Sequence, residues 1–431
     1  MDIQQLYRRF LSSTGVSTDT RQIGQGNLFF ALKGPNFNAN TFAATALEQG
    51  ASAVVVDEAP YAVDNDSRYI LVTDGLRALQ ELAAFHREQL NIPIVALTGS
   101  NGKTTTKELL HAVLSCKYNT LATIGNLNNQ IGVPLTLLRI TDNVEIAIIE
   151  MGANKQGDIQ ELCEIANPTH GLITNIGKAH LEGMGGPEGV LKTKTELFQH
   201  LRKNSGKVFI NSRQPIFSNM IRRFEEPVLF PEKGSFCEVE LVAADPFVSF
   251  RVGDSDEVFQ SQLIGSYNFD NIAAALTVGK FFDVPLVDAA KSVSNYRPSN
   301  MRSQLLEKRS NLIILDAYNA NPSSMGEALK AFDKMEGKSH KMVILGDMLE
   351  LGEHAEDEHR RLGEILAGMN IDKICLSGKL IQSALATAPK ALYFPDPFSF
   401  RIWLSDSKLE DYLILIKGSR GMKLEGLVEY I

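Results

Sequence analysis

The sequence predicts an α/β protein of three domains: a small α/β domain, a central P-loop domain on a parallel sheet, and a C-terminal doubly wound, Rossmann-like domain. The chain has 431 residues, and a domain of about 150 residues is the usual expectation, which suggests three. Strand-like runs alternate with helical patterns after residue 90, which is typical of βαβ units. We place the domains at residues 1–90, 91–298 and 299–431.

The first domain is predicted from short strand-like runs and one helix. The runs "NLFFAL" (27–32) and "SAVVV" (52–56) are apolar and short, as strands are. The segment "GLRALQELAAFHREQL" (75–90) has the apolar spacing of a helix with one buried face.

The central domain is predicted to begin at "NIPIVALTG" (91–99), where Pro93 heads a buried strand and its missing N–H costs least. Further strand-like runs are "VEIAIIE", "GLITN" and "KVFIN", and residues 238–264 are typical of an antiparallel hairpin. From residue 299 the pattern of strand followed by helix repeats, with strand-like runs "NLIILDAY", "KMVILGD", "KICLSG" and "YLILIKG". That repeat indicates a second open α/β sheet.

The composition argues against several classes of protein. The net charge is −8 and no block of Lys or Arg stands out, so we expect no nucleic-acid partner and no anionic membrane partner. No apolar run approaches the ~18 residues that a membrane span needs, and the N-terminus lacks the apolar core of a signal peptide. The four cysteines are far apart in the sequence, as expected for reduced core thiols in the cytoplasm.

The segment "ALTGSNGKTTTKEL" (96–109) predicts a phosphate-binding loop, although Gly99 lies two residues later than the general P-loop pattern places its first glycine. A strand, a glycine-rich turn and a helix N-terminus direct backbone N–H groups at one anion. Lys103 would reach the β- and γ-phosphates of a nucleotide, and Thr104 offers a hydroxyl to Mg²⁺. The alternative is a glycine turn that carries a surface lysine.

Two further side chains follow buried strands of the same domain. Glu150 ends "VEIAIIE", where a carboxylate can hold Mg²⁺ directly or through water. Asn175 and His180 lie just past "GLIT". Because the carboxyl ends of parallel strands share one edge of a sheet, we expect these residues near the loop.

Several motifs together resemble the Mur ligases, ATP-dependent amide-forming enzymes of peptidoglycan synthesis. They are "TGSNGKTT", "EMGA", "TNIGKAHLEG", "GSYNFDNIAAAL" and "DAYNANPSSM". The short glycine spacing of the loop is a mark of that family. The motifs "ALKG", "GNLNNQIGVPLTLL", "GDMLELGEHAEDEH" and "KGSRG" are similar to those of members that add D-alanyl-D-alanine to UDP-N-acetylmuramoyl-tripeptide.

The resemblance implies roles for single residues. Thr104 and Glu150 would bind the Mg²⁺ on the ATP phosphates, and His180 would help to hold a second Mg²⁺. The lysine that the family carbamylates falls on Lys194, with Lys192 as the competing choice. The full ATP-binding set would be Gly99, Ser100, Asn101, Gly102, Lys103, Thr104, Thr105, Asn271 at the adenine, Arg302 at the γ-phosphate and Asp316 at the ribose.

The resemblance also implies that the first domain binds the UDP end of the substrate through Ser17, Asp19 and Arg21, with Asn128 and Asn129 of the central domain as further substrate contacts. The chain departs from the family at "FNANTF" (37–42), where Asp-Gly-His is common. That departure puts the uridine contacts of this segment in doubt.

The implied reaction is acyl-phosphate formation from ATP and the tripeptide carboxylate, followed by attack of the dipeptide amine. The catalytic set would be Lys103, His180, Lys194 and Arg302, with ATP and Mg²⁺ as cofactors. A monomer is the family default, and the tripeptide ends in either meso-diaminopimelate or L-lysine. Two alternatives are another Mur-type ligase, such as a folylpolyglutamate synthase, and a P-loop nucleotide switch that forms no bond.

Overall fold

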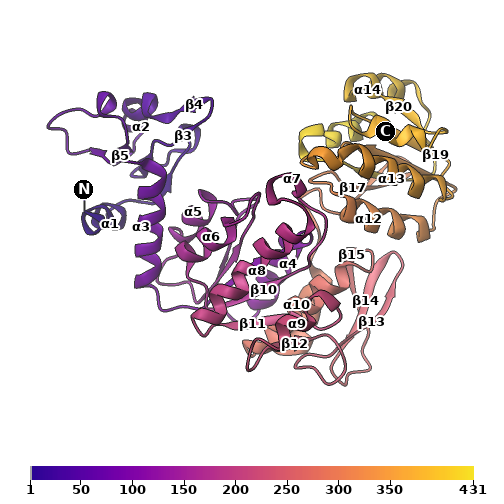
Figure 1. Ribbon diagram of the computed structural model, residues 1–431, viewed down its shortest axis with the longest axis horizontal. Helices are drawn as coiled ribbons and strands as arrows, with labels where there is room; N and C mark the ends of the chain where they lie inside the picture. The colour runs from indigo at the N-terminus through magenta and orange to yellow at the C-terminus, as the bar shows by residue number, and fades with distance from the viewer. Residues whose placement is uncertain (1) are drawn as a thin grey trace.

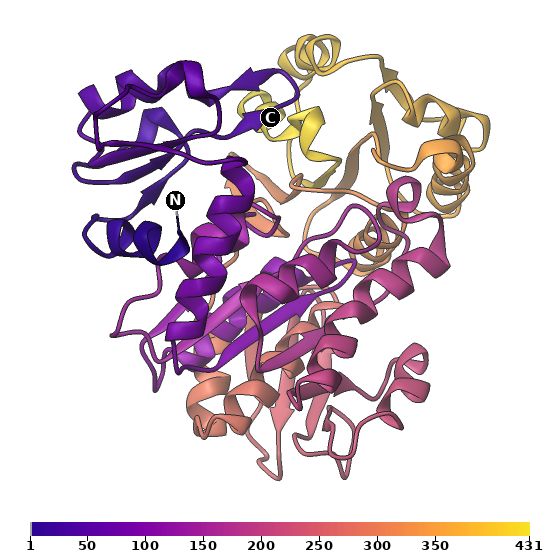
Figure 2. The same ribbon diagram turned by 60° about the vertical axis from the view of Figure 1, so that its left-hand side comes forward.

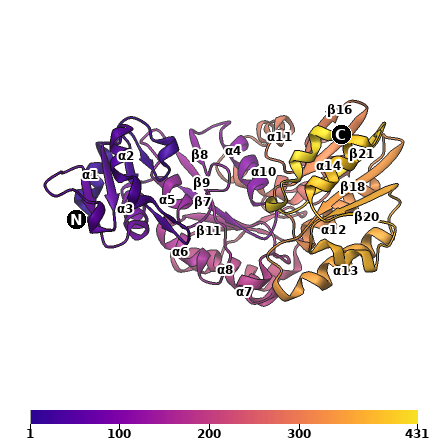
Figure 3. The ribbon, with the colours of Figure 1, turned by 90° about the horizontal axis from the view of Figure 1, so that it is seen from above.

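The computed structural model describes residues 2–431. The chain folds into three parts that follow one another in space as they do in sequence (Figure 1). Seen from above, the N-terminal part lies at one end, the C-terminal part at the other, and the central part between them (Figure 3). The view of Figure 2 brings the N-terminal part forward and shows α3 running from it to the central part.

The N-terminal part is built on a four-stranded sheet in the order β1-β2-β5-β6. All three pairings are parallel, and a small antiparallel hairpin of β3 and β4 lies beside the sheet. The elements are α1 (Ile3–Leu11), β1 (Val16–Ser17), β2 (Leu28–Phe30), β3 (Lys33–Gly34), β4 (Phe37–Asn38), α2 (Ala43–Glu48), β5 (Ala53–Val56) and β6 (Tyr69–Leu71).

Helix α3 (Gly75–Gln89) ties the N-terminal part to the central one. Its buried Arg87 donates from Nε to the carbonyl of Ala166 at 3.1 Å, and His86 Nε2 lies 3.0 Å from the carbonyl of Ile140. The guanidinium thus satisfies a carbonyl at the C-terminal end of α6 that would otherwise have no partner within that helix. Helix α3 therefore packs against both the N-terminal and the central part. The predicted domain boundary after residue 90 lies directly after this helix.

The central part contains a fully parallel sheet of six strands in the order β12-β11-β10-β7-β9-β8. Along β7, Ile94 and Ala96 pack into one apolar cluster, whereas Val95 and Leu97 pack into another. This alternation places α5, α6 and α8 on one face and α4, α10 and α11 on the other (Figure 3).

The strands of this sheet are β7 (Ile94–Thr98), β8 (Thr120–Ala122), β9 (Ile146–Glu150), β10 (His170–Ile173), β11 (Lys207–Asn211) and β12 (Val228–Phe230). The helices are α4 (Lys103–Leu114), α5 (Gly132–Leu137), α6 (Asp158–Ala166), α7 (Leu181–Met184), α8 (Pro187–Lys203), α9 (Ser218–Ile221), α10 (Asn268–Phe281) and α11 (Leu286–Asn295). The hairpin predicted at 238–264 is a three-stranded antiparallel sheet of β13 (Val239–Ala244), β14 (Phe247–Val252) and β15 (Phe259–Ile264).

The C-terminal part is a second six-stranded sheet, in the order β16-β17-β21-β18-β19-β20. Five strands are parallel, but the edge strand β16 pairs antiparallel with β17, which the sequence pattern did not predict. The elements are β16 (Gln304–Lys308), β17 (Asn311–Asp316), α12 (Pro322–Lys334), β18 (His340–Gly346), α13 (Ala355–Ala367), β19 (Lys373–Ser377), β20 (Leu392–Phe394), α14 (Pro397–Asp406) and β21 (Tyr412–Lys417).

The strand order brings the polar strand ends together. β10, β7 and β9 are neighbours, so Ile173, Thr98 and Glu150 end at one edge of the central sheet. β17 and β21 are neighbours in the C-terminal sheet, where Asp316 pairs in register with Lys417. Ligands of open α/β sheets bind beyond such carboxyl edges.

The structure also tests the predictions about the cysteines and about membrane-spanning segments. Cys163, Cys237 and Cys375 are buried free thiols as predicted, whereas Cys116 is exposed, so the expectation of a core thiol is wrong there. Across residues 2–431, the structure contains no helix of the length and apolar character that a membrane crossing requires.

Replacement of Leu345 by alanine should destabilise the C-terminal sheet. Leu345 lies in β18 and is fully buried, and removal of such a side chain typically costs about 2–5 kcal/mol of unfolding free energy. Urea unfolding followed by tryptophan fluorescence would measure this, since Trp403 packs in the same part of the chain. Leu392→Ala in β20, where the side chain is exposed, is the matched control and should change the midpoint little.

Candidate active site

The segment after β7 forms a tight turn that only glycine can make at two positions. Gly99 has φ +149°, and a Cβ there would lie 2.0 Å from Thr174 Oγ1. Gly102 has φ +77°, and a Cβ there would lie 2.4 Å from Asn271 Oδ1. Gly102 is also the residue before α4, so the N–H groups of the first turn of α4 remain available to an anion.

Lys103, the first residue of α4, folds back over this turn. Its Nζ donates to the carbonyl of Gly99 at 2.8 Å and to that of Ser100 at 3.4 Å. Burial lowers the pKa of Lys103, Glu150 opposes that effect, and Arg302 adds to it. A phosphate would supply the negative charge that favours the ammonium form.

Glu150 lies at the bottom of the same site and is fully buried. Its Oε1 accepts from Asn128 Nδ2 at 2.7 Å and from Thr104 Oγ1 at 3.3 Å. Its Oε2 makes no hydrogen bond to any of the described residues. A buried carboxylate oxygen without a partner is costly, and a bound cation would satisfy it.

Lys194, on α8, is buried with a bare amine. Its side chain is 1% exposed, and within residues 2–431 its Nζ has no hydrogen-bond partner. Burial, and then the charge of Lys103, lower the pKa of Lys194 to about 7, although Asp158 and Glu196 raise it. Lys192, two residues earlier, is exposed, so burial distinguishes the two candidates that the sequence left open.

His180 lies on the loop between β10 and α7 and lines the same cavity. Its Nδ1 is 2.5 Å from Oε2 of Glu350, which belongs to the C-terminal part. The hydrogen bond from His180 lowers the pKa of Glu350. Asn175, predicted near the loop, accepts from the backbone N–H of Asn101 at 2.9 Å.

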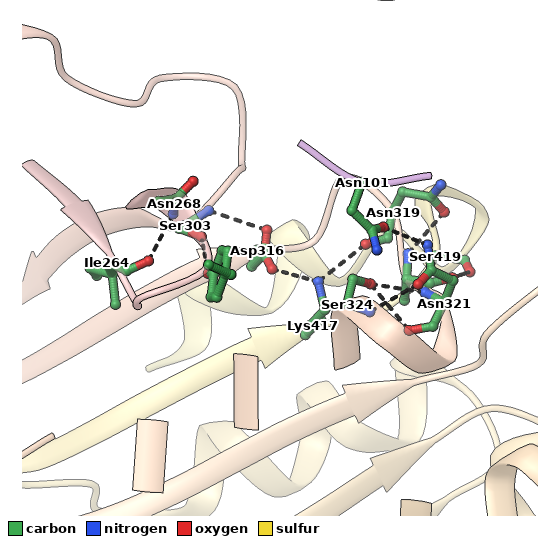
Figure 4. Close-up of polar contacts among 12 residues, drawn as sticks. Asn101, Ile264, Asn268, Ser303, Asp316, Asn319, Asn321, Ser324, Lys417 and Ser419 are labelled. Carbon is green, nitrogen blue, oxygen red and sulfur yellow. Dashed lines mark hydrogen bonds and ion pairs between the residues drawn. The ribbon is translucent and has the colours of Figure 1, made fainter. Parts of the chain in front are cut away.

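The C-terminal part faces this site with a charged cluster (Figure 4). Asp316 Oδ2 accepts from Lys417 Nζ at 2.5 Å, and its Oδ1 accepts from the N–H of Ser303 at 3.2 Å. The guanidinium of Arg302 lies over the ring of Tyr318, 3.9 Å from its centroid. Stacking on an aromatic ring holds a guanidinium flat and limits its rotation.

Direct contacts join the two parts at the phosphate loop. Asn321 Nδ2 donates to Asn101 Oδ1 at 2.7 Å (Figure 4). On the neighbouring loop, the backbone N–H of Lys178 donates to Ser323 Oγ at 3.0 Å, and its Nζ lies 2.7 Å from Glu358. Lys178 therefore acts across the two parts and does not line the cavity.

These groups enclose a cavity of about 420 Å³. Its lining includes predicted residues from both parts and further polar residues from the facing strand ends and loops. The predicted residues are Ser100, Asn101, Gly102, Lys103, Thr104, Thr105, Asn128, Asn129, Glu150, His180, Asn271, Arg302 and Asp316. Gly99 shapes the loop beneath, and Lys194 lies close enough to Lys103 for their charges to interact.

Both polar atoms of the Asn271 side chain are hydrogen-bonded within the protein. Its Oδ1 accepts from Thr106 Oγ1 at 3.0 Å, and its Nδ2 donates to Asn268 Oδ1 at 2.9 Å. The residue thus joins α10 to α4 while it forms part of the cavity wall.

The donor set can accept Mg²⁺. Thr104 supplies a hydroxyl and Glu150 an unpaired carboxylate oxygen, and Mg²⁺ prefers such oxygen ligands while it keeps several waters or phosphates. Among residues 2–431 there is no cluster of three or more His, Cys, Asp or Glu side chains that could hold a metal ion without other ligands. A metal here would share its coordination with the nucleotide.

The residues predicted for the UDP substrate do not form one cluster. Ser17, Asp19 and Arg21 lie in the N-terminal part, where Arg21 pairs with Asp19 at 2.7 Å and holds the pKa of that carboxyl at about 2. Asn128 holds Glu150, and Asn129 Oδ1 accepts two backbone N–H groups at the start of α5. The structure thus places these two asparagines in the phosphate cavity.

Sequence reasoning did not single out Tyr318, Asn321 or Lys417. The signal for Lys417 was available, because it is a polar residue at the end of the apolar run "YLILI". Tyr318 and Asn321 lie in an irregular segment after β17, where no periodicity marks a functional side chain.

Known proteins match the chain along almost its whole length. A family model described as Mur ligase middle domain matches residues 97–279, one described as Mur ligase, glutamate ligase domain matches 301–420, and one described as Mur ligase family, catalytic domain matches 12–87. A UDP-N-acetylmuramoyl-tripeptide--D-alanyl-D-alanine ligase of Bacillus subtilis is 36% identical over 422 residues, covering 96% of this chain and 92% of the relative.

The chain belongs to the Mur ligase family.

Other similar proteins agree with this assignment. The Escherichia coli protein of the same name as the B. subtilis relative is 34% identical, covering 96% of this Mur ligase and 92% of the relative. The solved structure of MurF from Acinetobacter baumannii has a TM-score of 0.86 at 30% identity and covers 99% of this chain and 97% of that one. MurF ligase of Thermotoga maritima in complex with ADP has a TM-score of 0.83 at 28% identity, with 98% and 97% covered.

Gly99→Ala should weaken ATP binding. The added Cβ would collide with Thr174 Oγ1, and φ +149° is unfavourable for alanine, so the loop must shift. Strain of about 1–3 kcal/mol is typical of such a backbone, which corresponds to a rise in Kd of about tenfold or more. Calorimetric titration with ATP measures it, and Gly326→Ala, where a Cβ meets nothing within 4 Å, is the control. An unchanged Kd in Gly99→Ala would contradict the phosphate-loop assignment.

Proposed function

We propose that this Mur ligase forms an amide bond between UDP-N-acetylmuramoyl-tripeptide and D-alanyl-D-alanine and couples the reaction to cleavage of ATP. The observation that carries the proposal is the single cavity that a phosphate loop and a second sheet enclose together, with Lys103 on one side and Arg302 on the other. A nucleotide switch needs no second sheet to bind its phosphates. The two relatives above are named for this reaction, and their similarity to the chain covers 96% of the chain and 92% of each relative.

In the first step, the tripeptide carboxylate attacks the γ-phosphorus of ATP, so that an acyl phosphate forms and ADP leaves. The backbone N–H groups of the loop and the side chain of Lys103 neutralise charge on the phosphates, and Arg302 does so from the opposite part. Positioning and charge neutralisation are the main demands of phosphoryl transfer. In the second step, the dipeptide amine attacks the acyl carbon and phosphate leaves.

Mg²⁺, when bound, would neutralise part of the negative charge of the phosphates. Thr104 and Glu150 would hold it, and Asn128 keeps Glu150 in place through its hydrogen bond to Oε1. His180 would serve a second ion. These three residues lie at the carboxyl edge of the central sheet: Thr104 in the first turn of α4, Glu150 at the end of β9, and His180 on the loop after β10.

Arg302 joins the site only when the two sheets approach each other. Its stacking on Tyr318 fixes the guanidinium from the C-terminal side, and Arg302 lowers the pKa of Lys103 across the cavity. Two cations that face one cavity repel each other, so a γ-phosphate between them would stabilise the closed arrangement.

Lys194 is best suited to work as a carbamate. A neutral amine attacks CO₂, one C–N bond forms, and one proton leaves, which yields an anionic carbamate with two oxygens. A pKa of about 7 leaves a large fraction of the amine neutral near physiological pH. The product would remove a buried unpaired amine and place oxygen ligands beside the second ion.

The substrate is long enough to bridge two parts of the chain. The UDP end would lie on the N-terminal part near Ser17, Asp19 and Arg21, while the peptide carboxylate reaches the cavity near Asn128 and Asn129. Phe37 on β4 and Phe42 in the short helical turn after it are two exposed stacked rings in the segment where the chain departs from the family.

The proposal is tested by ADP release with UDP-N-acetylmuramoyl-tripeptide and D-alanyl-D-alanine together and separately. We expect ADP release only when both substrates are present, and formation of the pentapeptide product by mass spectrometry. A reaction that contains a folate and glutamate in place of the two substrates distinguishes a folylpolyglutamate synthase-like ligase. Release of ADP without any acceptor would favour a nucleotide switch and contradict the proposal.

Lys194→Ala should be nearly inactive, whereas Lys192→Ala should retain most activity. Loss of a group that supports transition-state charge typically costs about 10²–10³ in rate, and Lys192 is exposed. Acetate should partly restore turnover in Lys194→Ala by filling the place of the carbamate. A ¹³C carbamate signal in protein equilibrated with ¹³CO₂, lost in Lys194→Ala and kept in Lys192→Ala, is the direct measurement. Full turnover of Lys194→Ala would exclude this role.

A further inference from the structure

The contact between His180 and Glu350 joins a cavity residue of the central part to a loop of the C-terminal part. His180 Nδ1 and Glu350 Oε2 are 2.5 Å apart. An ionised carboxylate only accepts, so Nδ1 carries the hydrogen of this bond. The other ring nitrogen, Nε2, makes no hydrogen bond to the described part of the chain, residues 2–431, and His180 lines the cavity. The contact therefore leaves Nε2 with a lone pair.

The backbone at both ends of this contact is unusual. His180 has φ +52° and Glu350 has φ +64°, and both values lie in the left-handed region. Only a few per cent of residues other than glycine adopt it, and such residues gather at functional sites. Both residues of the contact thus have this backbone conformation.

Glu350 is supported by a well-anchored loop. The carboxylate of Asp347 accepts three backbone N–H groups, from Lys379, Leu380 and Ile381. The N–H of Leu349 donates to Ser419 Oγ at 3.0 Å, and the side chain of Leu351 is buried. The loop therefore presents Glu350 in a fixed position.

Stability does not account for the pair. The side chain of Glu350 is 61% exposed, and an exposed ion pair contributes little to folding, with a median of about 0–1 kcal/mol. A carboxylate that receives the N–H of a metal-binding histidine, by contrast, fixes the tautomer and the ring orientation. The geometry fits this second use.

We propose that Glu350 is a positioning residue that orients His180 for the second Mg²⁺ of the site. The inference rests on the proposed function, because it assumes that His180 serves that ion. It adds that the C-terminal part completes the metal site by holding a histidine of the central part. Closure of the two parts and binding of the second ion then favour each other.

The test measures metal binding directly. Mn²⁺ replaces Mg²⁺ and is counted by electron paramagnetic resonance in the full-length enzyme with a non-hydrolysable ATP analogue. In Glu350→Ala we expect the Kd of the second Mn²⁺ to rise by about 10–100-fold, with the first Mn²⁺ unchanged. Glu350→Gln keeps an acceptor oxygen and should show a smaller rise.

Glu358→Ala is the matched control. It removes the other carboxylate that bonds across the same junction, the partner of Lys178, and should leave the Kd of both ions unchanged. A higher concentration of Mg²⁺ should restore binding of the second ion in Glu350→Ala. A general loss of packing would not be reversed in this way.

Two results would overturn the inference. One is an unchanged Kd for the second Mn²⁺ in Glu350→Ala. The other is a wild-type enzyme that binds a single Mn²⁺, which would remove the assignment of His180 as well. Neither result would contradict the proposed ligase function, because that function is tested separately by ADP release with both substrates.

Discussion

The site depends on two β-sheets whose carboxyl-terminal edges face each other. The central sheet ends with Thr98 and Glu150 on neighbouring strands, and the C-terminal sheet ends with Asp316 and Lys417 on neighbouring strands. Backbone donors and charged side chains collect at such edges because each parallel strand is followed by a loop on the same side. When two such edges face each other, a cavity that is lined mostly by polar residues results.

This cavity holds cationic and anionic side chains close together, which suits it to a phosphate that is bound with a metal cation. Lys103, Arg302 and the nearby Lys194 bring cationic groups together, and the pKa values of both lysines are lowered by burial and by their neighbours. Glu150 leaves one oxygen without a partner. A triphosphate with Mg²⁺ carries the complementary charges. The same features that cost free energy on their own are therefore the ones that would favour binding of such a ligand.

Most of the fold could be predicted from the sequence. The buried runs around β7, β9, β11, β17, β18 and β21 are apolar and bounded by turns, and the structure has strands there. The short strands β8, β12 and β20 were not predicted: each has three residues, and none lies in an apolar run as long as the one that marks β2. The antiparallel pairing of β16 was missed as well, because pairing direction is set by chain path and not by the residues of the strand.

Local signals also predicted many residues of the site, and contacts over long sequence separations account for the rest. The spacing around Gly99, Gly102 and Lys103 is enough to predict the phosphate loop, since glycine and a helix start act within a few residues. Burial separates Lys194 from Lys192, and only packing of α8 creates it. The contacts Asn101–Asn321 and His180–Glu350 join residues more than 160 positions apart. The sequence by itself determined the longer buried strands, the glycine-rich loop and the family motifs, because these depend on neighbours along the chain. The tertiary structure decided which strand ends face one another, because charge and burial depend on neighbours in space.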